Sequence, residues 1–278
     1  MASGRASDPH MFRIASGILA VGAAAAIVSA QSMKPAVRSE LAPTGRLRAG
    51  INYNNPLVAR RDAATGELRG TAVDLSRELA RRVGVTVDLV PYDAASPMSA
   101  AASSGAWDVA FLAVDPARAT DIEFTAPYIE LEGTYLVPAG SPLHRIEDVD
   151  RDGVRVAVTA RSAYDLFLTR ELKHAQLVRA TTTPESVDLM VAQKLDALAA
   201  VRTALVAAAP RITGSRVLSG HFMTIAHAAG VPRGRPAAAA FVRRFIEDVK
   251  ASGFVAEALA RHGLTSDDAI VAPLASVR

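Results

Sequence analysis

The chain of 278 residues contains no cysteine. Without thiols it can form no disulfide bond, no thiolate metal site and no cysteine nucleophile, and it has no cysteine to carry a lipid anchor. Aromatic residues make up only 5% of the chain, whereas 50% of its residues are hydrophobic. A chain of this length and composition can bury the core of one large domain or of two small ones.

A strong excess of charge is also absent. The isoelectric point is near 9.4, yet the formal net charge is only +3. Basic residues are scattered among acidic ones, without a run of like charge and without interleaved aromatic residues. We therefore do not expect nucleic acid as a partner.

Common enzyme motifs are missing as well. The sequence has no Gly-x-Ser-x-Gly elbow, no phosphate-binding loop and no dinucleotide fingerprint. We expect no catalytic residue, no metal site and no cofactor. Five histidines show no metal-ligand spacing and are each expected to be surface or packing residues: His144, His174, His221, His227 and His262.

The first thirty residues have the order that is typical of a secretory signal. A basic stretch ending at Arg13 precedes the apolar run Ile14–Val28, and small residues follow at Val28-Ser29-Ala30. An uncleaved membrane anchor is the alternative, but the run is short for a membrane span of about twenty residues. We expect cleavage near Ala30, a mature chain that begins at Gln31 and a periplasmic location. Met11 is an alternative start of translation.

Strand and helix patterns alternate along the rest of the chain. The amphipathic segment Val73–Val83 predicts a helix that ends at Gly84, and the apolar run Val109–Val114 predicts a parallel strand covered on both faces. This order predicts an α/β fold with right-handed crossovers. Further strands are expected at Leu47–Asn52, Val85–Val90, Val154–Val158, Ala197–Val201 and Phe222–Ala228. Further helices are expected at Pro97–Ser104 and Tyr164–Lys173, and another helix begins after Thr182, which would be its N-cap. The segment Pro236–His262 is expected to be helical, with breaks near Ser252-Gly253 and Gly263.

Arg118 follows the apolar run 109–114 in the polar turn Asp115-Pro116-Ala117-Arg118. In open α/β sheets, ligands bind beyond the carboxyl ends of the strands, which is where this turn would lie. The planar guanidinium of an arginine can bind a carboxylate with two parallel hydrogen bonds. Arg118 is therefore a candidate ligand-binding residue. On this pattern alone, a solvated surface arginine is the alternative.

The segment Phe124-Thr125-Ala126-Pro127-Tyr128 ends ten residues after Arg118. Here the chain resembles the family 3 extracellular solute-binding proteins, the polar amino-acid receptors of ABC importers. Their pattern at this place is a strand, a turn with an arginine, and then Phe-Ser-x-Pro-Tyr at the same interval. Looser matches extend the resemblance over about residues 45–264: Leu47–Gly50, Pro56, Asp74-Leu75, Gly105-x-x-Asp108, Gly153-x-x-Val156, Leu195-Asp196-Ala197 and Ala251–Phe254.

The resemblance implies a type II periplasmic binding protein fold, in which two α/β lobes are joined by two crossover strands. The ligand of such a protein lies between the lobes. The implied organisation is a signal peptide (1–30), a linker (31–45), a first lobe (45–137 and 222–264), a second lobe (139–220), a tail (265–278), and crossovers near Thr134–Pro138 and Gly220–Ile225.

The resemblance also implies which residues contact the ligand in the first lobe. Arg118 would hold the ligand's α-carboxylate. Ala113 and Asp115 stand where the family usually has Thr or Ser, so hydroxyl donors are missing there. The alternative for Asp115 is that its carboxylate caps the following turn. Tyr53, Asn54 and Asn55 lie near the family's ligand-packing aromatic residue, and an ordinary turn role is the alternative for the two asparagines.

In the second lobe, the segment Thr159–Tyr164 replaces the family's Gly-Thr-Thr/Ser segment at an expected helix N-terminus. Free N–H groups there favour a carboxylate, and Arg161 and Ser162 are its candidate contact residues. Ser162 also suits an N-cap position. Val201 stands where amino-acid receptors have an aspartate for the ligand's ammonium group, and Arg202 follows it. An ammonium group buried against Val201 would lack a counter-charge.

With Arg118, Arg161 and Arg202, the predicted cleft is net positive. We therefore expect an acid that needs no α-ammonium partner, such as a keto acid, a dicarboxylate or an acid with a distant amine. The alternative is that Arg202 points outward and that Asp115 takes an ammonium group.

The leading functional hypothesis is a monomeric periplasmic protein that captures a small anionic solute, amino-acid-like or an organic acid, for an ABC permease in the inner membrane. A cyclohexadienyl-dehydratase-like lyase is one alternative, with Glu130, Glu132 and Asp115 as candidate acids. A ligand-sensing receptor domain is the other. The fold alone does not distinguish these functions.

Overall fold

A computed structural model describes residues 35–266 and 268–275. The expected signal segment 1–30 lies outside the described residues, so its removal stays a prediction. Among the residues that the structure describes, no helix is long and apolar enough to cross a membrane.

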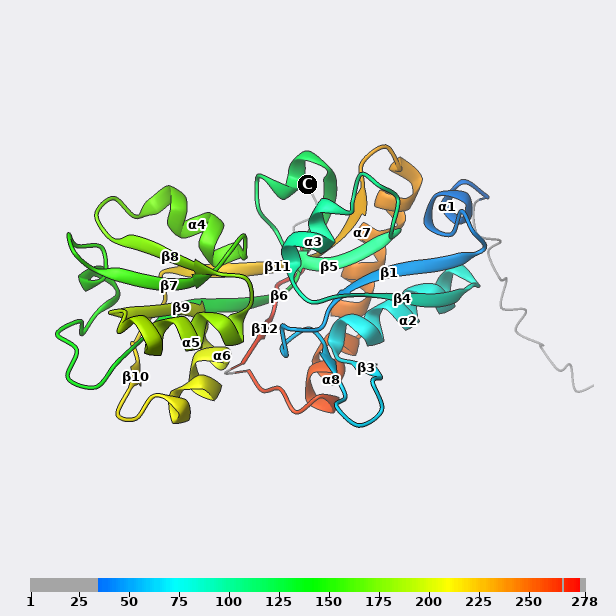
Figure 1. The fold of residues 1–278 in the computed structure, drawn as a ribbon. Coiled ribbons are helices and arrows are strands. Elements are labelled where there is room, and N and C mark those ends of the chain that lie inside the picture. Colours follow the sequence, from blue (N-terminus) through cyan, green and yellow to red (C-terminus); the bar gives the residue numbers. More distant parts are fainter. Residues whose placement is uncertain (1–34, 267, 276–278) are drawn as a thin grey trace, which may run out of the picture. The chain divides into compact units, whose positions relative to one another are not determined.

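A ten-stranded mixed sheet runs through the described residues, with the strand order β4-β1-β5-β11-β6-β9-β7-β8 along its main path (Figure 1). Strands β1, β4 and β5 pair in parallel in the first lobe, and β7, β8 and β9 do so in the second. The antiparallel pair β6 and β11 joins the two groups. The strands are β1 (Arg46–Asn52), β4 (Thr86–Tyr92), β5 (Val109–Ala113), β6 (Ile122–Val137), β7 (Arg155–Thr159), β8 (Gln176–Ala180), β9 (Ala197–Val201) and β11 (Met223–Pro232).

Helices pack along this sheet, and short strands add to its edges. A small hairpin forms a separate two-stranded sheet, while two short strands pair with β6. The helices are α1 (Pro35–Leu41), α2 (Thr71–Val83), α3 (Ala95–Ala100), α4 (Ala163–Glu171), α5 (Thr183–Gln193), α6 (Arg202–Ala208), α7 (Pro236–Ala251) and α8 (Phe254–Arg261); the hairpin is β2 (Arg60–Arg61) with β3 (Leu68–Arg69), and the short strands are β10 (Arg216–Val217) and β12 (Ile270–Val271).

Several local predictions are confirmed. Every residue of β5 and β9 is buried, as expected for strands whose two faces are both covered. The exception in the predicted run is Val114, which lies beyond the end of β5 and is exposed. Helix α2 ends at Gly84, whose φ of 72° places it in the left-handed region that glycine adopts without steric cost. The Thr182 side chain accepts a hydrogen bond from the Glu185 backbone N–H and caps α5. The predicted α/β fold class is therefore the observed one.

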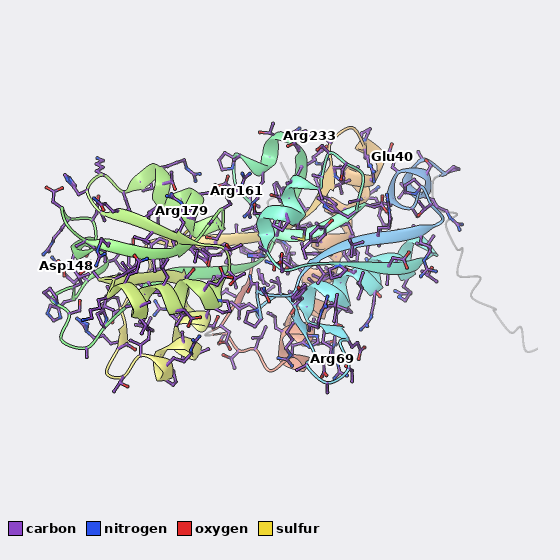
Figure 2. All side chains as sticks on the ribbon, viewed as in Figure 1. Glu40, Arg69, Asp148, Arg161, Arg179 and Arg233 are labelled. Carbon is purple, nitrogen blue, oxygen red and sulfur yellow. The ribbon has the colours of Figure 1, made fainter. Side chains whose placement is uncertain are left out.

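The N-terminal segment 31–45 differs from the polar linker that we expected, because it contains helix α1. Val37 and Leu41 are buried, and α1 contacts α7. The Glu40 carboxylate accepts a hydrogen bond of 2.8 Å from the Ala238 backbone N–H in the first turn of α7 (Figure 2). A carboxylate at a helix N-terminus is favourable because it satisfies a free N–H group and the helix dipole. This short helix therefore belongs to the packed structure.

Other helix and strand boundaries differ from the predicted ones. Helix α3 ends at Ala100, four residues before the predicted end. The strand expected at Phe222–Ala228 extends to Pro232 because it pairs along β6 and β5. The tail 265–278 contributes β12, and the sequence patterns did not predict β8 or α6.

Candidate functional site

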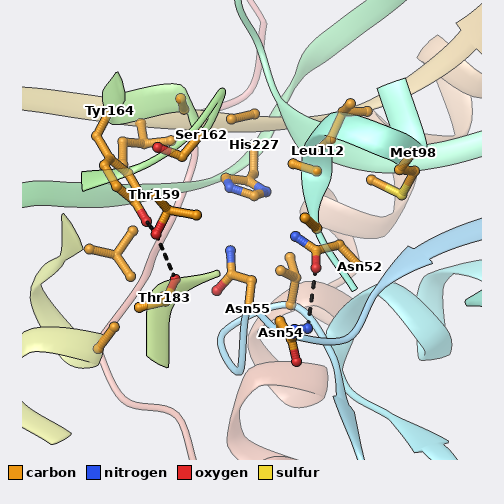
Figure 3. A pocket seen from close by; sticks show the side chains of 18 of the residues that line it. Asn52, Asn54, Asn55, Met98, Leu112, Thr159, Ser162, Tyr164, Thr183 and His227 are labelled. Atoms are coloured by element: carbon orange, nitrogen blue, oxygen red, sulfur yellow. Dashed lines mark hydrogen bonds between the residues drawn. The ribbon is translucent and has the colours of Figure 1, made fainter. Parts of the chain in front are cut away.

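A cavity of about 80 Å³ lies where the two lobes face each other (Figure 3). One water molecule needs roughly 10–15 Å³ by this measure, so the cavity has room for several waters or a small solute. Its lining includes the last residues of four strands: Asn52 of β1, Ala113 of β5, Thr159 of β7 and Val201 of β9. The cavity therefore lies at the carboxyl ends of the parallel strands, where α/β sheets bind ligands.

Arg118 lines this cavity and is 5% exposed. Its Nη1 donates to the Ala113 carbonyl oxygen at 2.9 Å, and its Nη2 donates to the Arg161 carbonyl oxygen at 3.0 Å. Within the described part of the chain, no carboxylate lies within ion-pair distance of Arg118. Burial lowers the pKa of Arg118 to about 10, although the nearby Asp115 raises it. Arg118 is therefore a cation at neutral pH without a paired anion.

His227 also lines the cavity and is 6% exposed. It lies opposite Ala113 of β5 and Ile129 of β6, and the register of β6 and β11 shifts directly after it. Such bulges redirect side chains and are frequent beside functional sites. Figure 3 shows the ring among the side chains that line the cavity. Burial, and secondarily Arg118, lowers the pKa of His227 to about 3, so the ring is neutral at neutral pH.

The second-lobe wall of the cavity carries a cluster of hydroxyl groups centred on Thr159. The Thr159 hydroxyl accepts a hydrogen bond of 3.0 Å from the Tyr164 hydroxyl. It also lies 3.2 Å from the Thr183 hydroxyl and 3.1 Å from the Ser186 hydroxyl. Thr159, Tyr164 and Thr183 line the cavity. This wall therefore offers neutral hydrogen-bonding groups that are held in place by one another.

Ser162 and Arg161 lie in the turn between β7 and α4, where Figure 2 labels Arg161. Ser162 lines the cavity and caps α4, since its hydroxyl accepts a hydrogen bond of 3.1 Å from the Asp165 backbone N–H. The Arg161 side chain is exposed and is not part of the lining. Its backbone has a φ of 57°, and its carbonyl oxygen accepts from Arg118. Arg161 thus gives the site a backbone acceptor, and its charge adds to the effect of burial in lowering the pKa of Arg118.

In the first lobe, Asn54 lines the cavity and Tyr53 does not. The Asn54 Nδ2 donates to the Asp93 carbonyl oxygen at 2.7 Å, which fixes the amide beside the cavity. The Tyr53 ring instead lies under the guanidinium of Arg61, with 4.4 Å between the guanidinium carbon and the ring centroid. Ala113 lines the cavity, as expected, and accepts from Arg118 through its carbonyl oxygen.

Asp115 is 3% exposed but is not part of the lining. Its Oδ1 accepts a hydrogen bond of 2.8 Å from the Ala117 backbone N–H, which confirms the alternative in which it caps the turn. Its Oδ2 lies 3.1 Å from Nη1 of Arg170 in α4. This ion pair connects the two lobes beside the cavity.

Arg202 lies away from the cavity lining, so the expected cluster of three arginine side chains does not form. Its Nε donates to the Glu132 carboxylate at 2.6 Å, and its Nη2 donates to the Gly220 carbonyl oxygen at 2.5 Å. Arg202 therefore ties the start of α6 to the segments that connect the lobes. The expectation of a dicarboxylate held by two guanidiniums loses its basis, because Arg118 is the arginine among the cavity-lining residues.

A family model described as bacterial extracellular solute-binding proteins, family 3, matches residues 47–265. The chain belongs to this family. None of the curated proteins matches the sequence of this family 3 protein.

Solved structures with the same fold include a mutant of ArgBP from T. maritima, with 20% identity, a TM-score of 0.70, and coverage of 82% of this chain and 99% of that one. The ancestral amino acid-binding protein AncCDT-1, a precursor of cyclohexadienyl dehydratase, has 21% identity, a TM-score of 0.68 and coverage of 80% and 97%. A putative ABC transporter binding component from Wolinella succinogenes, complexed with lysine, has 22% identity, a TM-score of 0.68 and coverage of 78% and 95%. These likenesses confirm the type II periplasmic binding protein fold.

The sequence patterns missed several lining residues of this family 3 protein. Asn52 ends a predicted strand, so the carboxyl-end rule applied to every strand finds it. Val201 and the segment 159–164 were expected at the site and supply lining residues. His227 lies inside a strand and faces the cavity next to a bulge, which no local pattern announces. The remaining missed residues are mostly apolar or small: Pro56, Val58, Asp93, Ala94, Ala95, Met98, Phe111, Leu112, Thr182, Thr183, Ala204 and Ile225.

Proposed function

We propose that this protein is a periplasmic receptor that captures a small carboxylate-bearing solute and delivers it to an ABC permease. The observation that carries this proposal is Arg118, a buried guanidinium that lines the cavity without a paired anion. Two of its N–H groups donate to carbonyl oxygens, which orient the guanidinium and leave other donors for a ligand. Asp115 acts on Arg118 electrostatically but pairs with Arg170 instead, and a buried cation without a directly paired anion is unfavourable. A bound carboxylate would offset that cost.

The rest of the lining suits a small solute with one acidic group. Asn52, Asn54 and Thr159 supply neutral hydrogen-bonding groups, while Phe111 and Leu112 are among the apolar residues. Asp93 is the other charged residue in the lining, and it is exposed. A mostly apolar pocket with a few placed polar groups is the usual form of a small-molecule site.

Contacts across the cavity support a closing receptor. Arg118 donates to the Arg161 carbonyl oxygen, and Asp115 pairs with Arg170, so both lobes take part. A solute that touches both walls favours the closed arrangement by its differential affinity for that state. Such a change is what a permease can detect when it accepts the loaded receptor.

The lyase alternative receives less support from the cavity. The candidate acids Glu130, Glu132 and Asp115 are not lining residues, and Glu132 pairs with Arg202. A dehydratase needs a group that can donate a proton to the departing oxygen, within hydrogen-bond reach. The similar solved structures are named as binding proteins or as the binding-protein precursor of a dehydratase.

Isothermal titration calorimetry can test carboxylate capture. Small 2-hydroxy, 2-keto and 2-amino carboxylates would be titrated in parallel with their primary amides, which keep the shape but lack the negative charge. We expect the carboxylates to bind and the amides to fail, and Arg118→Gln to lose the carboxylates. Arg216→Gln is the matched control, because Arg216 also donates to carbonyl oxygens but lies outside the lining. Equal binding of acids and amides would disprove the proposal.

A second measurement addresses transport. We expect deletion of the gene to abolish cellular uptake of the solute that binds best in calorimetry, and the intact gene to restore it. Uptake that is unaffected by the deletion would show that the protein binds the solute for another purpose.

A further inference from the structure

Among the described residues that line the cavity, His227 has a buried polar atom without a hydrogen-bond partner. Its Nδ1 is buried and has no hydrogen-bond partner within the described part of the chain. Buried polar atoms in proteins nearly always have a partner, so one without a partner beside a cavity indicates a group supplied by a ligand or by water. Figure 3 shows the ring between the asparagines of one wall and the hydroxyl cluster of the other.

The His227 ring lies on the strand that neighbours β5, and Arg118 follows β5 in the chain. His227 lies opposite Ala113 in the β5–β11 pair, and the Ala113 carbonyl oxygen accepts from Arg118. Both side chains line the same cavity, and Arg118 adds to the effect of burial in lowering the pKa of His227. A carboxylate held by Arg118 therefore places its neighbouring carbon atom near the imidazole.

A neutral imidazole carries one N–H donor and one acceptor nitrogen. It can donate to a keto oxygen, and it can either donate to a hydroxyl group or accept from one. An ammonium group at the same place would lie beside the Arg118 guanidinium, where like charges repel and burial adds a desolvation cost. Val201, which also lines the cavity, offers no counter-charge.

Asp93 is too far away to supply that counter-charge. It follows β4, and the strand order β4-β1-β5-β11 separates β4 from β5 by one strand. Neighbouring strands lie about 4.8 Å apart, so the end of β4 lies roughly 10 Å from the end of β5 and farther from β11. Asp93 is also exposed. It can face a remote part of a ligand, but not the group next to its carboxylate.

We propose that His227 selects solutes with an oxygen on the carbon next to the carboxylate, 2-hydroxy or 2-keto acids, over 2-amino acids. This inference rests on the proposed capture of a carboxylate by Arg118. It assigns the recognition of the second functional group to a residue that the sequence patterns treated as packing.

Matched triplets of probes test the selection. L-Lactate, pyruvate and L-alanine form one triplet, and L-2-hydroxyisocaproate, 4-methyl-2-oxopentanoate and L-leucine form another. In each triplet the side chain is constant and the group beside the carboxylate changes. For the wild-type protein, we expect an oxygen-bearing member to bind at least about tenfold more tightly than the amino acid, a ratio of the size that one well-placed hydrogen bond provides.

Variants of His227 separate recognition from packing. His227→Leu keeps the bulk without the nitrogens, and we expect the ratio to fall below about threefold, since the hydrogen bond is lost. His227→Asn places an amide near the position of Nδ1 and should retain part of the ratio, whereas His227→Gln, whose amide lies farther out, should not. Thr71→Val is the matched control, because the buried Thr71 hydroxyl also lacks a partner among the described residues but lies outside the lining.

The outcomes distinguish this inference from the proposed function. If no carboxylate binds the wild-type protein, carboxylate capture is wrong and the inference falls with it. If carboxylates bind but the amino acid is the tightest member of its triplet, only the role of His227 is wrong. The same holds if His227→Leu leaves the ratio unchanged. Should His227→Leu fail to fold, the contrast between His227→Asn and His227→Gln decides the matter.

Discussion

The two walls of the cavity differ in chemistry. The first-lobe wall, with β11, supplies the Arg118 cation, the His227 imidazole and side-chain amides such as that of Asn54. The second-lobe wall supplies hydroxyl groups, including those of Thr159 and Ser162, which are already bonded within their own lobe. Electrostatic attraction acts over a longer range than neutral hydrogen bonding. We infer that the first lobe captures the solute and that the second lobe closes over it.

Removing the Arg118 cation should have the largest effect on ligand affinity. We expect Arg118→Ala to weaken binding of a carboxylate by about 2–5 kcal/mol, the range found when one partner of a buried charge pair is truncated. Folding should change little, because the variant also removes a buried cation that lacks a paired anion. Calorimetry measures the affinity, and thermal denaturation without ligand measures the stability. An unchanged affinity would place the capture site elsewhere.

The imidazole of the same wall should make stability depend on pH. The pKa of His227 is about 3 in the folded protein, and a histidine in an unfolded chain has a pKa of about 6.5. Between these values the unfolded state binds the extra proton. The contribution of His227 to stability is therefore fully present above pH 6.5 and is lost as the pH falls toward 3.

The expected loss is about 1.4 kcal/mol per pH unit well inside this window. Urea denaturation at pH 7 and pH 5 would measure the free energy of unfolding. His227→Leu should show a smaller decrease than the wild-type protein, while Thr71→Val should keep the wild-type decrease. Equal slopes in the wild type and in His227→Leu would contradict the assignment of a neutral, buried ring.

Sequence reasoning located the framework of the site but not the direction of its side chains. The apolar runs 109–114 and 197–201 predicted β5 and β9, and the rule about strand ends then placed Arg118 at the cavity. These features follow from local patterns because a strand with both faces covered must be apolar throughout.

The directions of Arg161 and Arg202 depend on contacts that are distant in the sequence. Arg161 has a left-handed backbone and an exposed side chain outside the lining, and its carbonyl oxygen accepts from Arg118, 43 positions away in the sequence. Arg202 is drawn to Glu132, 70 positions away in the sequence, and to the Gly220 carbonyl oxygen. A local pattern specifies an arginine at a strand end, but not which acceptor its flexible side chain reaches.

Removing the ion pair between Asp115 and Arg170 should have a moderate effect on closure and on ligand affinity. Arg170 is about half exposed and Asp115 is buried, so Arg170→Ala leaves the Asp115 carboxylate with its turn hydrogen bond but without its cross-lobe partner. We expect a loss of closed population and a decrease in affinity worth roughly 1 kcal/mol, the upper range for a partly exposed pair. Small-angle scattering with saturating ligand and calorimetry measure the two quantities.

The control for this ion pair is Arg81→Ala, because Arg81 pairs with Glu78 within a single helix of the first lobe. That variant should leave both closure and affinity unchanged. If Arg170→Ala binds like the wild type and closes to the same extent, the pair is a passive surface contact.

A change in the second-lobe wall should have the smallest effect on ligand affinity. Thr159→Val keeps the shape of the side chain but removes the hydroxyl that accepts from Tyr164 and contacts Thr183 and Ser186. We expect the free energy of unfolding to fall by about 1 kcal/mol, because the buried hydroxyl network loses its centre. Affinity should fall by less than about threefold if the wall mainly completes closure. Thr169→Val serves as the control, since Thr169 is hydrogen-bonded in the same lobe outside the lining. A loss of affinity as large as that of Arg118→Ala would mean that the second lobe, rather than the first, captures the solute.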